Sequence, residues 1–188
     1  MLVLESSRLR LRPFGDGDAA PFSAYRSDPE VARYQSWEPP FSLAQAREFI
    51  RSMEASEPGA PGVWYQLAVE RKTEPGLIGD CVFRIQASDP EQAEIGFTLS
   101  PGHQGQGYAT EAVERLLAHL FLDRRLHRVT AICDAENLRS ARLLARVGMR
   151  REGHLIENIR FKGRWGSEFL YAIRADEWKD RTVAADVR

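Results

Sequence analysis

The sequence predicts one α/β (α+β) domain, built on a single mixed, mostly antiparallel central sheet of about seven strands with helices on both faces. Short apolar segments typical of strands alternate with longer segments of helical periodicity. Their order is strand, helices, three strands, helix, strand, helix and two strands, which puts βα units in the second half. No linker divides the 188 residues, so we expect one domain over 1–188, with a core from about residue 4 to 178 and a frayed polar tail.

The first part of the chain predicts one strand followed by helices. Leu9 and Leu11 alternate with arginines, a period-two pattern typical of a strand. The helical pattern of residues 16–33 is interrupted by two prolines, which predicts two short helices. A further helix is expected from Ser42, because this serine and Gln45 three residues later form a capping-box pattern.

The rest of the chain predicts further strands, bounded by glycine and proline turns, and two more helices. The strands are expected at residues 63–70, 77–85, 93–99, 128–133, 149–160 and 168–174. One helix carries an apolar stripe from Val113 to Phe121. The other is capped by Asn137 and ends at Gly148.

Composition and charge exclude several classes of protein. Lys and Arg number 26 against 27 Asp and Glu, so the net charge of -1 gives no global attraction to nucleic acid or to an anionic membrane. Cys81, Cys133 and the four histidines show no ligand spacing, so no metal site is expected. The sequence shows no signal peptide and no apolar run of about 18 residues. We therefore expect a cytoplasmic protein with reduced thiols, and no nucleic-acid or membrane partner.

A glycine-rich segment from Pro101 to Ala109 lies between a predicted strand and a predicted helix. The first N–H groups of a helix have no partner within it, and the helix dipole favours an anion there. Glycines let the backbone wrap closely around phosphate oxygens, so such a loop can bind phosphate without a lysine. A plain strand-to-helix turn without a ligand is the alternative. The segment lacks both the dinucleotide-binding fingerprint and the P-loop pattern.

The loop also carries a family motif. The run Gln104-Gly105-Gln106-Gly107-Tyr108-Ala109 matches the pattern Gln/Arg-x-x-Gly-x-Gly/Ala of the GNAT superfamily of N-acetyltransferases. Asn137-Leu138-Arg139-Ser140, Gly148-Met149 and Glu152-Gly153 also resemble motifs of this family. Residues 4–12 and 93–97 are similar to the branch that includes the ribosomal-protein N-terminal (alanine or serine) acetyltransferases. The resemblance covers the chain from about residue 4 to 178.

The resemblance implies that acetyl-CoA is the co-substrate, without a metal, and that its acetyl group passes to a primary amine by direct attack in a ternary complex. The pyrophosphate would lie on the loop and the first turn of the helix: Gln104, Gly105, Gln106, Gly107, Tyr108, Ala109 and Thr110. The pantetheine arm would pair with the preceding strand at Phe97, Thr98 and Leu99. A bulge is expected to splay this strand from its neighbour. Asn137 would bind near the pantetheine end, or would serve only as a helix cap.

Two side chains are candidates for catalysis. Glu94, on the strand before the loop, could accept the proton of the attacking amine through water, and Glu157 and Glu168 are the alternatives. A plain surface role is also open for Glu94. Many family members have a tyrosine seven residues after the motif asparagine, whereas this chain has Leu144. Ser140 is therefore the candidate donor to the departing thiolate, unless its hydroxyl only caps the helix.

The acceptor pocket is expected between the early helices and the last hairpin. Its candidate residues are four aromatic side chains and a carboxylate that would recognise a cation: Tyr34, Trp37, Glu38, Phe161 and Trp165. Packing over the core is the alternative role for the aromatics. The acceptor would be a protein or peptide N-terminus, a small-molecule amine, or an aminoglycoside-like compound. A non-catalytic CoA-binding regulatory module on the same fold is the alternative function. The branch resemblance also allows a homodimer.

Overall fold

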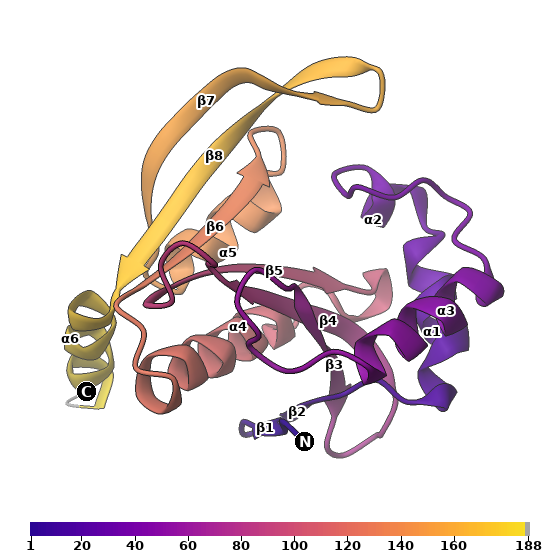
Figure 1. Cartoon of the computed structure of the whole chain (residues 1–188), viewed down its shortest axis with the longest axis horizontal. Helices are drawn as coiled ribbons and strands as arrows, with labels where there is room; N and C mark the ends of the chain where they lie inside the picture. Colours follow the sequence, from indigo (N-terminus) through magenta and orange to yellow (C-terminus); the bar gives the residue numbers. More distant parts are fainter. Residues whose placement is uncertain (187–188) are drawn as a thin grey trace.

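One eight-stranded sheet forms the centre of the molecule (Figure 1). The computed structural model describes residues 1–186, with side chains as far as Arg181. The strands are β1 (Leu4–Glu5), β2 (Leu9–Arg12), β3 (Tyr65–Arg71), β4 (Leu77–Ile85), β5 (Gln92–Leu99), β6 (Arg128–Asp134), β7 (Arg150–Phe161) and β8 (Arg164–Arg174). Their order across the sheet is β1-β2-β3-β4-β5-β6-β8-β7. All neighbours are antiparallel except the parallel pair β5 and β6, which confirms the predicted mixed sheet.

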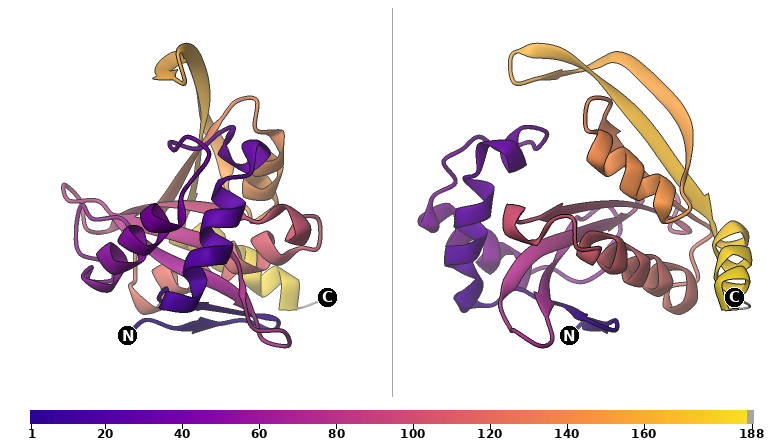
Figure 2. Two further views of the ribbon diagram at one scale, coloured as in Figure 1. Left: turned by 90° about the vertical axis from the view of Figure 1, so that its right-hand side faces the viewer. Right: turned by 180° about the vertical axis from the view of Figure 1, so that it is seen from behind.

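Helices cover both faces of this sheet (Figure 2). The helices are α1 (Ala19–Arg26), α2 (Pro29–Ala32), α3 (Leu43–Glu54), α4 (Tyr108–Ala118), α5 (Leu138–Arg146) and α6 (Ala175–Asp186). Phe22 of α1 and Ile50 of α3 belong to an apolar cluster that includes Ala68 of β3. Val113 and Leu116 of α4 belong to a second cluster that includes most of the buried strand residues. Two separate cores therefore lie on the two sides of the sheet.

The predicted count of about seven strands is one too few. The additional strand is β1, which has two residues and pairs Leu4 with Leu11 of β2. A strand this short shows no alternation of useful length, so periodicity does not mark it.

Only one of the two prolines expected to interrupt the first helical segment does so. Pro21 is the third residue of α1, where the backbone N–H has no partner within the helix, so a proline is tolerated. Pro29 does begin a new helix, α2, whose N-cap Asp28 accepts hydrogen bonds from the backbone N–H groups of Glu30 and Val31.

Strands β7 and β8 form a long curved hairpin that arches over the rest of the molecule (Figure 1). Its tip is a tight turn, because Lys162 (φ 48) and Gly163 (φ 80) both have left-handed backbone. The last strand therefore begins at Arg164 instead of residue 168. The Lys162 ammonium donates to the carbonyl groups of Ala32 at 2.8 Å and Trp37 at 2.9 Å. These bonds fix the hairpin tip to α2 and the loop that follows it.

Strands β5 and β6 separate along their length, although not by the bulge that was expected. Their pairing ends at Ile95 and Ala131. Beyond that point β5 continues in unbroken register with β4 as far as Leu99. Strand β6 continues in register with β8 as far as Asp134. The two strands diverge because each follows its other neighbour, and a gap opens between them.

The sequence predicts a frayed polar tail after residue 178, of which residues 187–188 lie outside the described part of the chain. Helix α6 continues past Trp178 to Asp186. The Trp178 ring lies 5.6 Å from the ring of Phe121, measured between centroids, and this contact anchors the helix. Among the described residues, the helices are too short or too polar to cross a membrane.

Candidate active site

The gap between β5 and β6 contains a cavity of about 110 Å³. This cavity is lined by four residues that the sequence assigns to cofactor binding, catalysis or acceptor binding: Tyr34, Phe97, Asn137 and Ser140. Leu144 also lines it, so the position at which many family members have a tyrosine does face this space. Without a hydroxyl at Leu144, Ser140 is the side-chain hydroxyl that α5 presents to the cavity.

The glycine-rich loop leads from β5 into α4. Gly105 (φ +76) and Gly107 (φ +81) have left-handed backbone, which costs a residue with a side chain about 1–2 kcal/mol. Gly107 is the N-cap of α4, and a glycine has no side chain that could accept from the first N–H groups of the helix. A Cβ at Gly105 would meet open space. The first N–H groups of α4 are thus uncapped, and the backbone can approach an anion closely, which fits a pyrophosphate.

The strand and loop residues assigned to the cofactor form one continuous path. Phe97 lines the cavity, whereas Thr98 and Leu99 continue β5 opposite Asp80 and Gly79 of β4. Gln104 donates from its side-chain amide to the carbonyl group of Leu99 at 2.9 Å. The loop is therefore tied to the end of the strand along which a pantetheine arm would lie.

Two arginines of α5 border the loop, and neither was predicted from the sequence. Arg139 donates to Oε1 of Gln104 at 3.0 Å, and Arg146 donates to the Thr110 hydroxyl at 3.5 Å. They lie seven residues apart, which places them on one face of a helix. This spacing was visible in the sequence, although the partner across the gap was not.

Asn137 occupies the N-cap of α5. Its Oδ1 accepts a hydrogen bond from the backbone N–H of Ser140 at 3.1 Å. Asn137 therefore caps α5, which is one of the two roles considered for it, and it also lines the cavity. Its side-chain NH₂ group can donate a hydrogen bond to a ligand in the cavity.

Glu94 lies on the same sheet face as Gly96, two residues away along β5. Gly96 lines the cavity, whereas Glu94 lies beyond it. The Glu94 carboxylate accepts from Arg84 at 2.8 Å, and the Arg84 guanidinium stacks on Trp64. Of the alternatives, Glu157 is exposed. The Glu168 carboxylate accepts from the Asn158 amide at 2.6 Å.

The other residues predicted for the acceptor pocket lie apart from the cavity. Trp37 packs over the Arg26 guanidinium at 4.0 Å and donates from Nε1 to the Arg26 carbonyl group. Glu38 is an ion-pair partner of Lys162 at 3.6 Å. Phe161 and Trp165 lie on the β7–β8 hairpin, and the Trp165 side chain is exposed. Tyr34 is the predicted acceptor residue that reaches the cavity.

Two further cavity residues, Cys133 and Asp134, end β6 and were not predicted. Burial raises the pKa of the Cys133 thiol to about 11, and the neighbouring carboxylates of Asp134 and Glu168 add to the shift. Asp134 and Glu168 face each other across β6 and β8. Within the described part of the chain, neither carboxylate has a lysine or arginine partner within 4.0 Å. Asp134 therefore makes the wall of the cavity formed by β6 acidic, and Glu168 lies beside this wall on β8, outside the cavity lining.

A family model described as an acetyltransferase (GNAT) domain matches residues 8–150. An uncharacterized N-acetyltransferase, YnaD of Bacillus subtilis, is 32% identical over 175 residues, which are 93% of this chain and 98% of that protein. A ribosomal protein uS5-alanine N-acetyltransferase of Escherichia coli is 29% identical over 84 residues, 45% of this chain and 43% of the relative.

Two solved structures are also similar to this chain. A GNAT-family acetyltransferase from Bacillus anthracis superposes with a TM-score of 0.83 at 30% identity, covering 93% of this chain and 99% of the other. A spermidine N-acetyltransferase from Vibrio cholerae, solved with CoA and spermine, gives a TM-score of 0.78 at 24% identity over 93% and 99% of the two chains. The second similarity concerns the fold alone. Taken with the motifs and the gap between β5 and β6, these matches show that the chain belongs to the GNAT family of acetyltransferases.

Proposed function

We propose that the protein transfers the acetyl group of acetyl-CoA to a cationic primary amine, within a ternary complex held at the gap between β5 and β6. The observation that carries the proposal is the cavity in this gap, with Phe97 on one side and Asn137 and Ser140 on the other. The glycine-rich loop follows the end of β5. A cofactor whose pyrophosphate lies on the loop would extend its pantetheine arm along β5 and bring the thioester to the cavity.

In the proposed reaction the amine nitrogen attacks the carbonyl carbon of the thioester. A C–N bond forms, the C–S bond breaks, and CoA leaves as a thiolate. Because β5–β6 pairing ends at Ile95, the backbone N–H groups that face the gap beyond this residue are free of that ladder. One of them can donate to the carbonyl oxygen as it gains charge. The cavity then contributes chiefly by holding the nitrogen in line with the carbonyl group.

Proton transfer is assigned to Glu94 and Ser140. Glu94 is two strand residues, about 7 Å, from Gly96 of the cavity wall, so its carboxylate would receive the ammonium proton through water. The ion pair with Arg84 holds this carboxylate in one position. The Ser140 hydroxyl would donate to the departing thiolate, because position 144 is a leucine here.

The acidic wall supports a cationic acceptor. Asp134 and Glu168 would attract an ammonium group beyond the reacting nitrogen. A polyamine meets this requirement, as does a peptide N-terminus followed by a basic side chain. The names of the similar proteins include both types, spermidine for the Vibrio cholerae enzyme and a ribosomal protein for the Escherichia coli enzyme. The proposed location is the cytoplasm, where a thiol such as Cys133 stays reduced.

The test is release of free thiol from acetyl-CoA in the presence of single amines: spermidine, an amino-acid amide, an aminoglycoside, and peptides that begin with alanine or serine. We expect release with at least one cationic amine. Asp134→Asn should raise KM for that amine and leave KM for acetyl-CoA unchanged. No release with any amine, together with tight binding of CoA, would favour the non-catalytic regulatory module.

A further inference from the structure

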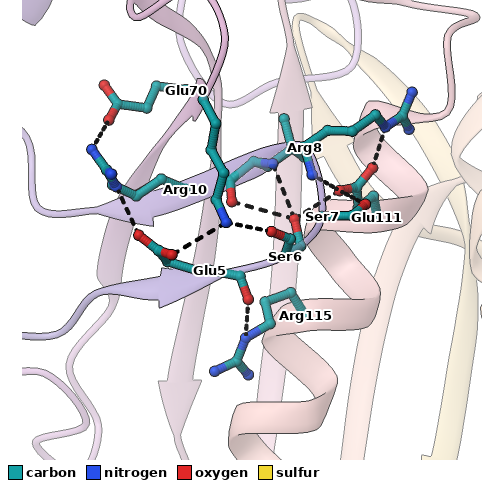
Figure 3. A network of polar contacts seen from close by, with 10 residues as sticks. Glu5, Ser6, Ser7, Arg8, Arg10, Glu70, Glu111 and Arg115 are labelled. Atoms are coloured by element: carbon teal, nitrogen blue, oxygen red, sulfur yellow. Dashed lines mark hydrogen bonds and ion pairs between the residues drawn. The ribbon is translucent and has the colours of Figure 1, made fainter.

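The turn between β1 and β2 is hydrogen-bonded to the first turn of α4, more than 100 residues away in the sequence (Figure 3). Glu111 of α4 is the centre of this contact. Its Oε1 accepts from the hydroxyl groups of Ser6 at 2.8 Å and Ser7 at 3.0 Å, and from the backbone N–H of Arg8 at 2.8 Å. Its Oε2 accepts from Nε of Arg8 at 2.6 Å. The carboxylate therefore holds both the backbone and the guanidinium of Arg8.

The same guanidinium contacts three consecutive residues of the glycine-rich loop. Its Nη1 donates to the carbonyl group of Gln106 at 3.1 Å. Its Nη2 lies 3.3 Å from the position that a Cβ of Gly107 would occupy. Its plane stacks over the Tyr108 ring, with Cζ 4.6 Å from the ring centroid. One side chain thus joins the N-terminal turn to the part of the loop that begins α4.

This contact fixes the direction of a peptide group next to the expected anion. When Arg8 holds the Gln106 carbonyl oxygen on its own side, the N–H of the same peptide group, which belongs to Gly107, must point the opposite way. A loop with left-handed glycines at positions 105 and 107 has many other conformations available. Holding one of them before the ligand arrives reduces the entropy that binding must offset.

Glu111 alone would oppose an anion at this place, since it lies in the first turn of α4. Although burial raises the pKa of Glu111, the hydrogen bonds from Arg8, Ser6 and Ser7 lower it overall, so the group is ionised at neutral pH. The carboxylate faces Arg8 in the folded protein. Its charge is therefore opposed by the guanidinium at 2.6 Å instead of being directed at the ligand.

We propose that Arg8 is a positioning residue for CoA: anchored on Glu111, it holds the Gln106 carbonyl group so that the loop N–H groups face the pyrophosphate. This inference rests on the proposed function, because it requires CoA to bind at the loop. Arg8 acts through the loop backbone and not through the thioester. Its effect should therefore appear in CoA affinity and be absent from kcat.

The experiment measures CoA affinity by calorimetry. It compares Arg8→Gln and Glu111→Gln with two control variants. Arg115→Gln removes another α4 contact, the 3.0 Å bond to the Glu5 carbonyl group. Arg10→Gln removes ion pairs to Glu5 of β1 and Glu70 of β3 (Figure 3). We expect Arg8→Gln to bind CoA about tenfold more weakly, as the loss of one charge-assisted hydrogen bond implies. Both controls should bind it like the parent.

The variant Glu111→Gln distinguishes the anchoring of Arg8 from the effect of the Glu111 charge alone. Loss of a negative charge near the ligand would by itself tighten CoA binding. If Glu111 anchors Arg8, the variant should bind CoA at least threefold more weakly than the parent does, an effect of about 0.7 kcal/mol. Unchanged or tighter binding by Glu111→Gln would overturn the proposal, as would a loss in Arg8→Gln no larger than in the controls.

A second substrate distinguishes the loop from general damage to the fold. S-acetylpantetheine lacks the pyrophosphate, so Arg8→Gln should raise KM for acetyl-CoA about tenfold and leave KM for S-acetylpantetheine and kcat unchanged. Equal increases for both substrates would overturn the proposal. If Arg8→Gln does not fold, Arg8→Lys decides, because lysine keeps the charge but lacks the planar fork whose two nitrogens contact Glu111 and Gln106. Arg8→Lys should then bind CoA more weakly than the parent, and an affinity equal to that of the parent would overturn the proposal. Parent affinity for CoA is the separate test of the proposed function, since a parent that binds no CoA would remove both claims.

Discussion

Gln104 and Arg139 are hydrogen-bonded across the space between the glycine-rich loop and α5, with 3.0 Å between Oε1 and Nη1. The other end of the Gln104 amide donates to the Leu99 carbonyl group of β5 at 2.9 Å. One side chain therefore joins the strand, the loop and the second helix of the predicted cofactor site. This bond also places a guanidinium beside the loop expected to bind the pyrophosphate.

Arg139→Gln should weaken the binding of CoA about three- to tenfold, because an exposed cation near a diphosphate contributes on the order of 1 kcal/mol. The loss should shrink as salt is raised, since salt screens exposed charges. Calorimetry at low and high ionic strength measures both effects. Arg10→Gln, on β2, is the control for removal of an arginine. Equal CoA affinity of Arg139→Gln and the parent at low salt would remove Arg139 from the site.

Gly107→Glu should abolish measurable CoA binding, because it places a negative charge at the N-cap of α4, where the pyrophosphate would lie. The neutral control is Gly107→Gln, which carries the same backbone strain of about 1–2 kcal/mol at φ +81. Comparing CoA affinity of the two variants isolates the charge. Equal affinities would mean that no anion binds at this helix end.

Asn137→Ala should lower both stability and cofactor affinity. Loss of the cap on α5 costs about 1 kcal/mol of unfolding free energy. Loss of the amide donor at the cavity should raise KM for acetyl-CoA. Asn137→Ser keeps a capping hydroxyl, so it should recover the melting temperature without recovering KM. Recovery of both quantities by serine would leave Asn137 with the cap as its single role.

Glu94→Gln should reduce kcat about 100-fold, with the largest loss at low pH. At high pH the acceptor amine is already neutral and needs the base less. The pH profile of kcat measures this, with Glu157→Gln and Glu168→Gln as parallel variants for the two alternative bases. If the pH profile of kcat for Glu94→Gln coincides with that of the parent, Glu94 is rejected as the general base. The base is then the alternative glutamate whose variant changes the profile.

Glu111→Gln should destabilise the protein at neutral pH and not at low pH. The hydrogen bonds from Arg8, Ser6 and Ser7 outweigh burial and lower the pKa of Glu111 below its ordinary value of 4.5. A carboxyl group whose pKa is lowered by folding stabilises the protein above its ordinary pKa and loses this contribution as the pH falls through the folded value. We expect a difference in unfolding free energy of about 1 kcal/mol near pH 7.

Urea unfolding of parent and Glu111→Gln across this pH range tests that sign. The difference between them should shrink steadily as the pH drops below 4.5, the ordinary pKa of the carboxyl group. A difference that stays constant, or grows toward acid, would mean that Glu111 is not held by these donors.

The elements with a long, clear periodicity could be predicted from the sequence. Strand β4 and the capping box at Ser42 and Gln45 occur where the pattern puts them. Features that exist only because of tertiary contacts could not be predicted from the sequence. The two-residue β1 exists because Leu11 of β2 is its partner, and the gap between β5 and β6 exists because β6 follows β8.

The residues of the candidate site also fall into those that could be predicted from the sequence and those that could not. Motif positions such as Asn137 and Ser140 meet at one cavity, since both belong to the start of α5, whose local geometry is fixed by the cap. Trp37 lies elsewhere, because the buried Arg26 guanidinium attracts it into the α1–α3 core. Asp134 has no local pattern that marks it. It reaches the cavity because β6 ends there.

The most direct measurement is a crystal structure of the protein with CoA. We expect diphosphate oxygens within about 3 Å of the backbone nitrogens of residues 105–109, and the thiol in the cavity between Phe97 and Asn137. A diphosphate bound away from these nitrogens, or a thiol outside the gap between β5 and β6, would contradict the placement of the acetyl transfer site.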